Sequence, residues 1–248
     1  LSEYVKTVNS VDTENDNAVL LNIPTSDGYS QAVHPDVIYN PDGFGVDKKS
    51  FWMVCTPYPN QDDRYENPEL FQSDDGYFWQ VPKNVNNPVQ PKPHGFKNHN
   101  SDSSMLMNDK EIIIFYRTSI FKKKTVENTI FKITALQDLK FNKPEQILKS
   151  NDSLFLSPVV KKIKDQWIMW TVDYSDSKKK LYPLKIFQRK SKDLKSWSNP
   201  NMVNVEGLPE NEHPWHIGML QIDNNIICLL TTYIPNKKIL LTQNWYAK

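Results

Sequence analysis

Five short polar motifs carry the side chains of this sequence that are best suited to chemistry. Each motif precedes a pair of apolar residues and a turn, and together they contribute the groups of Asp36, Glu66, Asp102, Ser157 and His216. Two carboxyl groups that share a site can act as a general acid and a general base. Carboxylates also accept hydrogen bonds from ligand hydroxyls without any proton transfer. These residue types therefore suit acid–base catalysis or the recognition of a hydroxyl-rich ligand.

The spacing of the motifs indicates a repeated structural unit. The apolar pairs fall in DVIY, ELFQ, SMLM, SPVV and GMLQ, at intervals of roughly 30 to 60 residues, which is the range typical of solenoids and propellers. The apolar runs between them are short, rich in Ile, Val, Phe, Trp and Thr, and bounded by Asn, Asp, Gly, Pro and Ser, as strands and turns are. Proline is frequent, with 17 residues, which disfavours helices.

We therefore predict an all-β, five-bladed β-propeller as a single domain over residues 22–248. Residues 1–21 are predicted to be a peripheral or connecting segment. Five blades of about 45 residues each account for the length of the chain, and blades packed around an axis hide most of their strand edges. The first strand of each blade lines the central channel, so the five polar motifs are expected to converge on one funnel.

Composition excludes several classes of partner. Lys and Arg total 30 and Asp and Glu total 29, so the net charge is +1, and neither nucleic-acid binding nor adsorption to an acidic membrane is expected. The apolar runs are too short for membrane insertion, and the first residues, LSEYVKTVNS, do not form a secretory signal. Cys55 and Cys228 lie in apolar runs and are expected to be buried thiols.

A second repeat occurs in SDDGYFW at 73–79 and SKDLKSW at 191–197. Each has Ser, then Asp two residues later, then Trp four residues after that. This pattern predicts two tight turns, each with a packed tryptophan.

The motifs HPDV, FWMVCTPYP, ENPEL and SDDG, over residues 34–90, resemble the five-bladed β-propeller superfamily of glycoside hydrolases, which includes families 43, 32 and 130. The later segments NSDSSML, LSPVV and WHIGML are similar through the layout of the blades alone. The chain is also similar to propeller domains of receptor-binding proteins of bacteriophages that attach to Gram-positive cell walls. This resemblance implies an extracellular or virion-surface location, and a homo-oligomer within a larger assembly.

The resemblance to family 43 implies a base Asp on blade one, a supporting Asp on blade three and an acid Glu on blade four. Asp36 and Asp102 match the first two. Ser157 stands where the Glu is expected, and a hydroxyl cannot serve as a general acid near neutral pH. Glu66 is then the alternative acid, in an inverting arrangement whose carboxyl groups would lie roughly 6.5 to 9.5 Å apart.

The candidate ligand-binding set combines these motifs with nearby aromatic, basic and amide side chains. Its members are His34, Asp36, Tyr65, Glu66, Asn67, His99, Asp102, Arg117, Ser157, Trp215 and His216. The resemblance places His216 at the channel axis, where some related propellers bind a cation such as calcium; a hydrogen-bonded core histidine is the alternative. No His/Cys/Asp spacing indicates a strong metal site, and no cofactor is required.

Three functional hypotheses follow from the sequence. The first is recognition of a polysaccharide or cell-wall glycan by a hydrolase-like propeller with a degenerate catalytic site, as the serine at 157 favours. The second is an active glycosidase that uses Asp36 and Glu66, with Asp102 as the supporting carboxylate. The third is a structural or protein-interaction propeller. The sugar, its linkage and the oligomeric state are left open.

Overall fold

The computed structural model describes residues 20–174, 183–222, 225–234 and 239–247. Within these residues the fold is all-β, with strands, turns and two single-turn 3-10 helices, η2 (Pro59–Gln61) and η3 (Asp63–Tyr65). No helix in these ranges is both long and apolar enough to cross a membrane. The predicted segment 1–21 lies almost wholly outside the described residues.

The described strands form four antiparallel sheets, and each sheet is a meander of strands consecutive in sequence. The strands are β1 (Ala32–Phe44), β2 (Lys49–Pro57) and β3 (Glu69–Ser73) in the first sheet; β4 (His99–Met107), β5 (Glu111–Phe121), β6 (Val126–Leu136) and β7 (Glu145–Ser150) in the second; β8 (Leu156–Ile163), β9 (Gln166–Tyr174), β10 (Leu184–Ser191) and β11 (Asn201–Val203) in the third; and β12 (His213–Ile222), β13 (Asn225–Ile234) and β14 (Ile239–Ala247) in the fourth.

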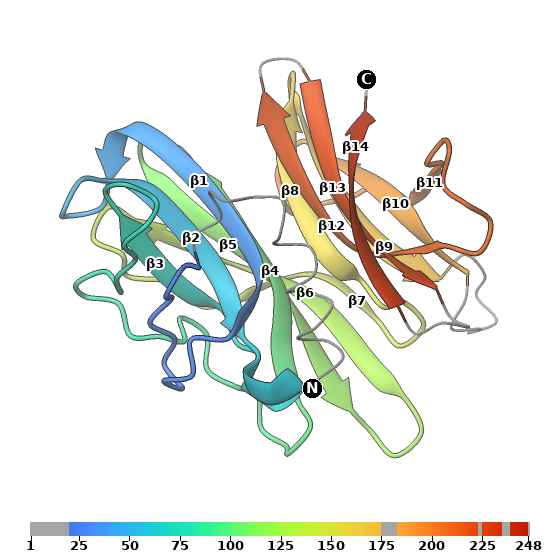
Figure 1. The fold of residues 1–248 in the computed structure, drawn as a ribbon, viewed down its shortest axis with the longest axis horizontal. Helices are drawn as coiled ribbons and strands as arrows, with labels where there is room; N and C mark the ends of the chain where they lie inside the picture. The colour runs from blue at the N-terminus through green and yellow to red at the C-terminus, as the bar shows by residue number, and fades with distance from the viewer. Residues whose placement is uncertain (1–19, 175–182, 223–224, 235–238, 248) are drawn as a thin grey trace.

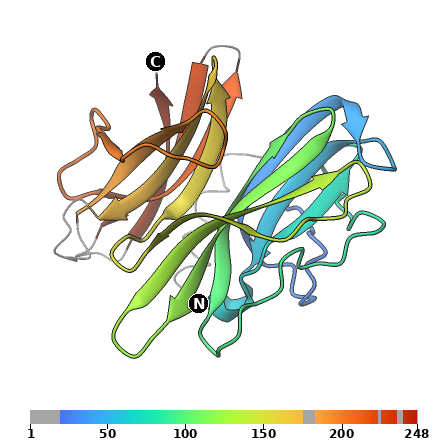
Figure 2. The same cartoon turned by 180° about the vertical axis from the view of Figure 1, so that it is seen from behind.

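The first strands of the four sheets lie at the centre of the molecule. Strand β4 contacts both β1 and β8, and β8 also contacts β12. The later strands fan outward, with β3 and β11 on opposite flanks (Figure 1), and the view from behind shows the same radial arrangement (Figure 2). This is the blade order of a propeller, as predicted.

One detail of the predicted blade assignment is wrong. The ENPEL motif does not begin the first strand of a separate blade, because Glu69–Ser73 is β3, the third strand of the first sheet, paired with β2. A polar motif followed by a short apolar run can begin either the first or the third strand of a sheet. The sequence pattern therefore could not distinguish these two positions. The described residues therefore supply four sheets, and the count of five blades stays a prediction.

Three apolar cores lie between successive sheets. The first packs Trp52 and Leu70 of the first sheet against the second, and the next packs the second sheet against Phe155 and Met169 of the third. The last packs the third sheet against Ile217 and related residues of the fourth. Face-to-face packing of sheets thus holds the first strands in place around the axis.

The sequence of strand β5 reflects its packing between two sheets. Its run IIIFY is apolar at every position, whereas a strand with one wet face would alternate. Ile112 and Ile114 face the core shared with the first sheet, while Ile113 and Phe115 face the core shared with the third sheet. The unbroken apolar run therefore reflects burial on both faces.

The predicted turns and thiols are confirmed. In the segment 73–79, Asp75 Oδ1 accepts hydrogen bonds from two backbone N–H groups, and in the segment 191–197 Asp193 Oδ1 does the same. The tryptophan of each turn packs against an apolar core. Cys55 and Cys228 are both buried and unpaired with each other.

Candidate functional site

The candidate site is built on irregularities near the start of the first strands. Strands β1, β4 and β8 each break register with their neighbour at the position of the polar motif, and β12 does so at Trp215. His34, Asp102 and Ser157 occupy the break in β1, β4 and β8, with φ angles of 54°, 53° and 48°. Bulges of this kind redirect a side chain that would otherwise follow the strand alternation. His34, Asp102 and Ser157 therefore occupy equivalent positions in the first strands of three sheets.

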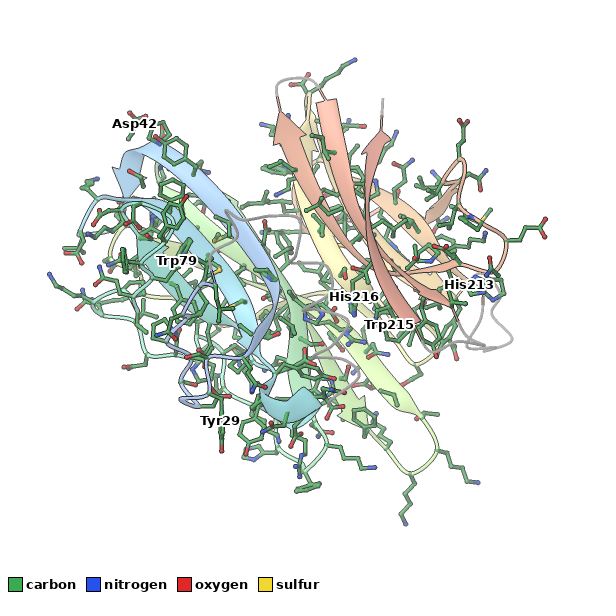
Figure 3. The ribbon with its side chains drawn as sticks, viewed as in Figure 1. Tyr29, Asp42, Trp79, His213, Trp215 and His216 are labelled. Carbon is green, nitrogen blue, oxygen red and sulfur yellow. The ribbon has the colours of Figure 1, made fainter. Side chains whose placement is uncertain are left out.

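The bulges bring two imidazoles against one buried carboxylate. His216 Nδ1 lies 3.0 Å from Asp102 Oδ1, and His34 Nε2 lies 3.5 Å from the same oxygen. The two imidazole rings are 4.5 Å apart between centroids. Figure 3 shows His216 near the centre of the molecule, with Trp215 beside it. Three sheets therefore contribute one side chain each to a cluster that we call the His34–Asp102–His216 cluster.

The other oxygen of Asp102 is held by Arg117 of β5. Arg117 Nε lies 2.8 Å from Asp102 Oδ2, and Ser101 Oγ donates to the same oxygen at 3.0 Å. Burial alone would raise the pKa of Asp102, but Arg117, His34 and His216 outweigh it and hold that pKa well below its usual range. Asp102 is consequently an anion, with one oxygen fixed and the other directed at the imidazoles.

Glu66 borders the cluster on the side of β2. Its Oε2 lies 3.5 Å from His34 Nδ1 and 3.5 Å from Thr56 Oγ1. Burial lowers the pKa of His34, but the carboxylates of Asp102 and Glu66 outweigh burial, so this pKa is raised. The pKa of His216 is lowered by burial and by the neighbouring His34. Both effects favour the neutral form of the His216 ring, the form in which an imidazole can bind a metal ion.

The cluster has the donor set and spacing of a metal site. One ligand atom from each of the three residues lies within 4.8 Å of the others. Metal–ligand bonds of about 2.0–2.2 Å place neighbouring donors of a tetrahedral site about 3.3–3.6 Å apart, close to the 3.0 and 3.5 Å seen here. Asp102 Oδ1 is buried and its contacts are with the two imidazoles, His216 Nδ1 at 3.0 Å and His34 Nε2 at 3.5 Å, and a cation between these three donors would replace those contacts. These residues fit a divalent cation with two imidazole ligands and one carboxylate.

Asp36, predicted to be the catalytic carboxylate of the first motif, lies two residues beyond the bulge. Its Oδ2 accepts a hydrogen bond of 2.8 Å from the N–H of Met105, and its Oδ1 lies 3.9 Å from Lys161 Nζ. Burial raises its pKa, against the effects of Lys161 and the Met105 N–H. The structure thus places His34, rather than Asp36, at the position equivalent to Asp102.

The remaining predicted residues fall into two groups. Ser157 joins the cluster, because its Oγ lies 2.9 Å from His216 Nδ1, and Trp215 stands edge-on to the His216 ring at 5.5 Å. Outside the cluster, Tyr65 is half exposed at the end of η3. Asn67 Oδ1 accepts a hydrogen bond from the Asn100 amide.

His99 faces away from this group. It is buried, with its Nδ1 3.1 Å from the Lys97 carbonyl and its ring against Phe121. Sequence reasoning missed Thr56 and Ser101, which hold Glu66 and Asp102 through their hydroxyls. The sequence offered one signal for each: Thr56 lies next to the end of a predicted strand, and Ser101 precedes the motif residue Asp102.

Comparison with known proteins places this geometry in context. No family model matches the chain. A stretch of 78 residues is 35% identical to the A type blood N-acetyl-alpha-D-galactosamine deacetylase of Flavonifractor plautii, and it covers 32% of this chain. The match spans only 10% of the length of that relative.

Solved structures show the fold. An N-acetylgalactosamine deacetylase from F. plautii, crystallised with blood group B trisaccharide, has a TM-score of 0.74 and 20% identity, covering 87% of this chain and 67% of that one. A thermostable family-43 glycoside hydrolase has a TM-score of 0.57 and 13% identity, over 88% and 72% of the two chains. The endo-arabinase of Bacteroides thetaiotaomicron has a TM-score of 0.59 and 15% identity, over 86% and 74%. The chain is a propeller similar to a carbohydrate deacetylase and to family-43 hydrolases.

Proposed function

We propose that this chain binds an N-acetylated sugar of a cell-surface glycan at the His34–Asp102–His216 cluster and, with a divalent cation held there, hydrolyses the acetamide. The observation that carries the proposal is the convergence of the buried Asp102 Oδ1 and two imidazole nitrogens, at 3.0 and 3.5 Å from that oxygen, in the geometry of a three-donor metal site. Two histidines and one carboxylate are a ligand set of hydrolytic metal sites. The deacetylase activity in the names of the similar proteins supports this choice of reaction.

A cation bound there would supply Lewis-acid chemistry, which polarises a carbonyl and eases the deprotonation of water. The residues of the chain have separate roles. Arg117 keeps Asp102 ionised and oriented through Oδ2. Glu66 lies beside the cluster, and its carboxylate can accept the proton of the water that attacks the acetamide carbonyl. Returning that proton to the departing nitrogen would release acetate and leave a free amine on the sugar.

Glu66 has a second role that the experiment must separate from the first. Its Oε2 lies 3.5 Å from His34 Nδ1, and a carboxylate on the far nitrogen of a ligating histidine orients the ring and tunes its basicity. A base is needed at every cation concentration, whereas an orienting group is needed chiefly for cation affinity. The cation dependence of a Glu66 variant therefore distinguishes the two.

The test is to incubate the chain with a trisaccharide that ends in N-acetylgalactosamine and zinc, and to measure acetate and new reducing ends. Acetate without reducing ends is expected. Glu66→Gln should lower the rate of acetate release by about 10²- to 10⁴-fold, with the loss persisting at saturating zinc. Glu206→Gln, an exposed loop residue, serves as the matched control and should not alter the rate.

Other outcomes would select the alternative functions. Reducing ends that disappear in Glu66→Gln would establish the glycosidase that uses Asp36 as base and Glu66 as acid. Glycan binding without either product would establish a recognition module with a degenerate site, as expected for a phage receptor-binding protein. If neither binding nor turnover is detected, the structural or protein-interaction propeller is the remaining hypothesis.

A further inference from the structure

A pocket of about 390 Å³ opens near the chain segments that border the His34–Asp102–His216 cluster, although no cluster residue lines it, and its volume is within the range of small-molecule sites. Two chain segments contribute residues to both the border of the cluster and the wall of the pocket. Thr56 and Glu66 contact the cluster, while the residues next to them in sequence, Pro57, Tyr65 and Asn67, line the pocket. The pocket therefore lies one residue along the chain from two side chains that border the cluster.

The pocket presents two exposed aromatic rings. Phe96 is 72% exposed and Tyr65 is 46% exposed, and both line the pocket. The Arg64 guanidinium lies over the Phe96 ring, 4.6 Å from its centroid, and so supports the ring from one side. Exposed aromatic rings of this kind offer flat apolar surfaces that match the C–H faces of a pyranose ring.

The polar groups of the pocket nearly balance in charge. Its cations are Arg64 and Lys92, and its carboxylates are Asp27 and Glu69. Arg64 is already paired with Asp62 just outside, and Lys92 Nζ donates to the Phe96 carbonyl at 3.1 Å. This balance favours a neutral ligand over an acidic sugar or a phosphate, because an added anion would meet two carboxylates as well as two cations.

One polar atom of the pocket lacks a partner. Asp27 Oδ2 is buried with no hydrogen bond, while its Oδ1 accepts bonds from Thr25 Oγ1 and the Tyr29 N–H. The neighbouring Glu69 is fully engaged by Ser26 through its backbone N–H and its hydroxyl. A buried acceptor without a donor is rare unless a ligand or water supplies one. A rotation of the Asp27 side chain that exposes this oxygen to the pocket would let a sugar hydroxyl donate to it.

We propose that this pocket is a second sugar subsite, which takes a neutral pyranose of the same glycan whose N-acetylated unit occupies the cluster. Phe96 and Tyr65 stack on the ring, Asp27 accepts from a hydroxyl, and Lys92 donates to one. The proposal rests on the proposed function of the cluster. It adds that the substrate is an oligosaccharide and that selectivity for it arises outside the reacting unit.

The test compares the affinity of the chain for N-acetylgalactosamine alone with its affinity for a neutral trisaccharide that ends in this sugar, by calorimetry. The trisaccharide should bind at least about tenfold more tightly. Phe96→Ala and Asp27→Asn should each reduce this ratio severalfold. Phe78→Ala is the matched control, since Phe78 is 82% exposed on the 73–79 turn, outside the pocket, and it should preserve the ratio.

The outcomes separate this inference from the proposed function. Equal affinities for the two sugars, or ratios in Phe96→Ala and Asp27→Asn that match the unmutated chain, would overturn the subsite. A ratio that collapses in these variants, in a chain that releases no acetate, would support the subsite and count against the deacetylase. Tighter binding when the neutral neighbour is replaced by a uronate would contradict the charge argument and overturn the neutral class.

Discussion

At the scale of single residues, Asp102 organises the candidate site by dividing its two oxygens between two tasks. Oδ2 is fixed by Arg117 and Ser101, and Oδ1 faces the two imidazole nitrogens at 3.0 and 3.5 Å. A carboxylate that is anchored at one oxygen and open at the other is preorganised for one-sided binding of a cation. The groups that anchor Oδ2 come from β4 and β5, and the imidazoles that face Oδ1 come from β1 and β12.

Arg117→Ala should destabilise the fold by about 3 to 5 kcal/mol, because it leaves Asp102 as a buried anion without its strongest partner. Arg117→Lys should cost less, since it keeps the charge but loses the second contact to Ser101. Urea unfolding at pH 7 measures both changes. The control is Arg64→Ala, which breaks a solvent-screened pair with Asp62 and should change the stability much less. Equal losses in the two alanine variants would contradict this view of Asp102.

At the scale of elements, the bulges of the first strands decide which residues meet. His34, Asp102 and Ser157 all take a left-handed backbone conformation, which is uncommon for residues other than glycine. The shared conformation at three equivalent positions indicates one structural solution repeated in three blades. Its consequence is that the residue at the bulge, and not the residue two positions later, reaches the cluster.

The repeated turns give an element-scale prediction on pH. Hydrogen bonds from the N–H groups of Ser196 and Lys195 lower the pKa of Asp193 to about 2. Because this folded pKa lies below the unfolded value of about 3.9, the carboxylate stabilises the turn above that value, and the contribution is lost as pH falls through about 2. Carboxyl titration by NMR should give a midpoint near 2. The Asp193→Asn variant identifies the resonance of this carboxyl group. A midpoint near 4 would mean that the backbone N–H groups of the turn do not stabilise the Asp193 carboxylate.

At the scale of the whole molecule, the cluster links three of the four described sheets, through β1, β4 and β12. A ligand held by all three exists only while the sheets keep their radial arrangement. Binding there should therefore stabilise the complete fold and not one blade alone.

Zinc at about 100 times its dissociation constant should add about 2.7 kcal/mol to the stability, which raises the midpoint of thermal unfolding by roughly 5 to 10 °C. Differential scanning fluorimetry with and without a chelator measures the shift. In Asp102→Asn, which removes the open carboxylate oxygen, the shift should vanish. A shift of full size in that variant would place the cation elsewhere.

The sequence by itself determined the all-β class, the blade-like spacing, the two Ser-x-Asp turns and the buried thiols. Each of these depends on local chemistry: β-branched and aromatic runs favour strands, and an Asp side chain two residues after Ser closes a turn onto nearby N–H groups. The motif residues Asp102 and His216 were also identified, because a polar group beside an apolar strand is visible without knowing the fold.

Only the tertiary structure decided which motif residues meet. Asp36 and His34 share one motif, and a bulge that shifts register by a residue determines which of them faces the cluster. Glu66 reaches His34 from the loop before a third strand and not from a blade of its own. Contacts such as His216 with Asp102 join residues more than a hundred positions apart. They depend on how the sheets pack around the axis, which no local pattern encodes.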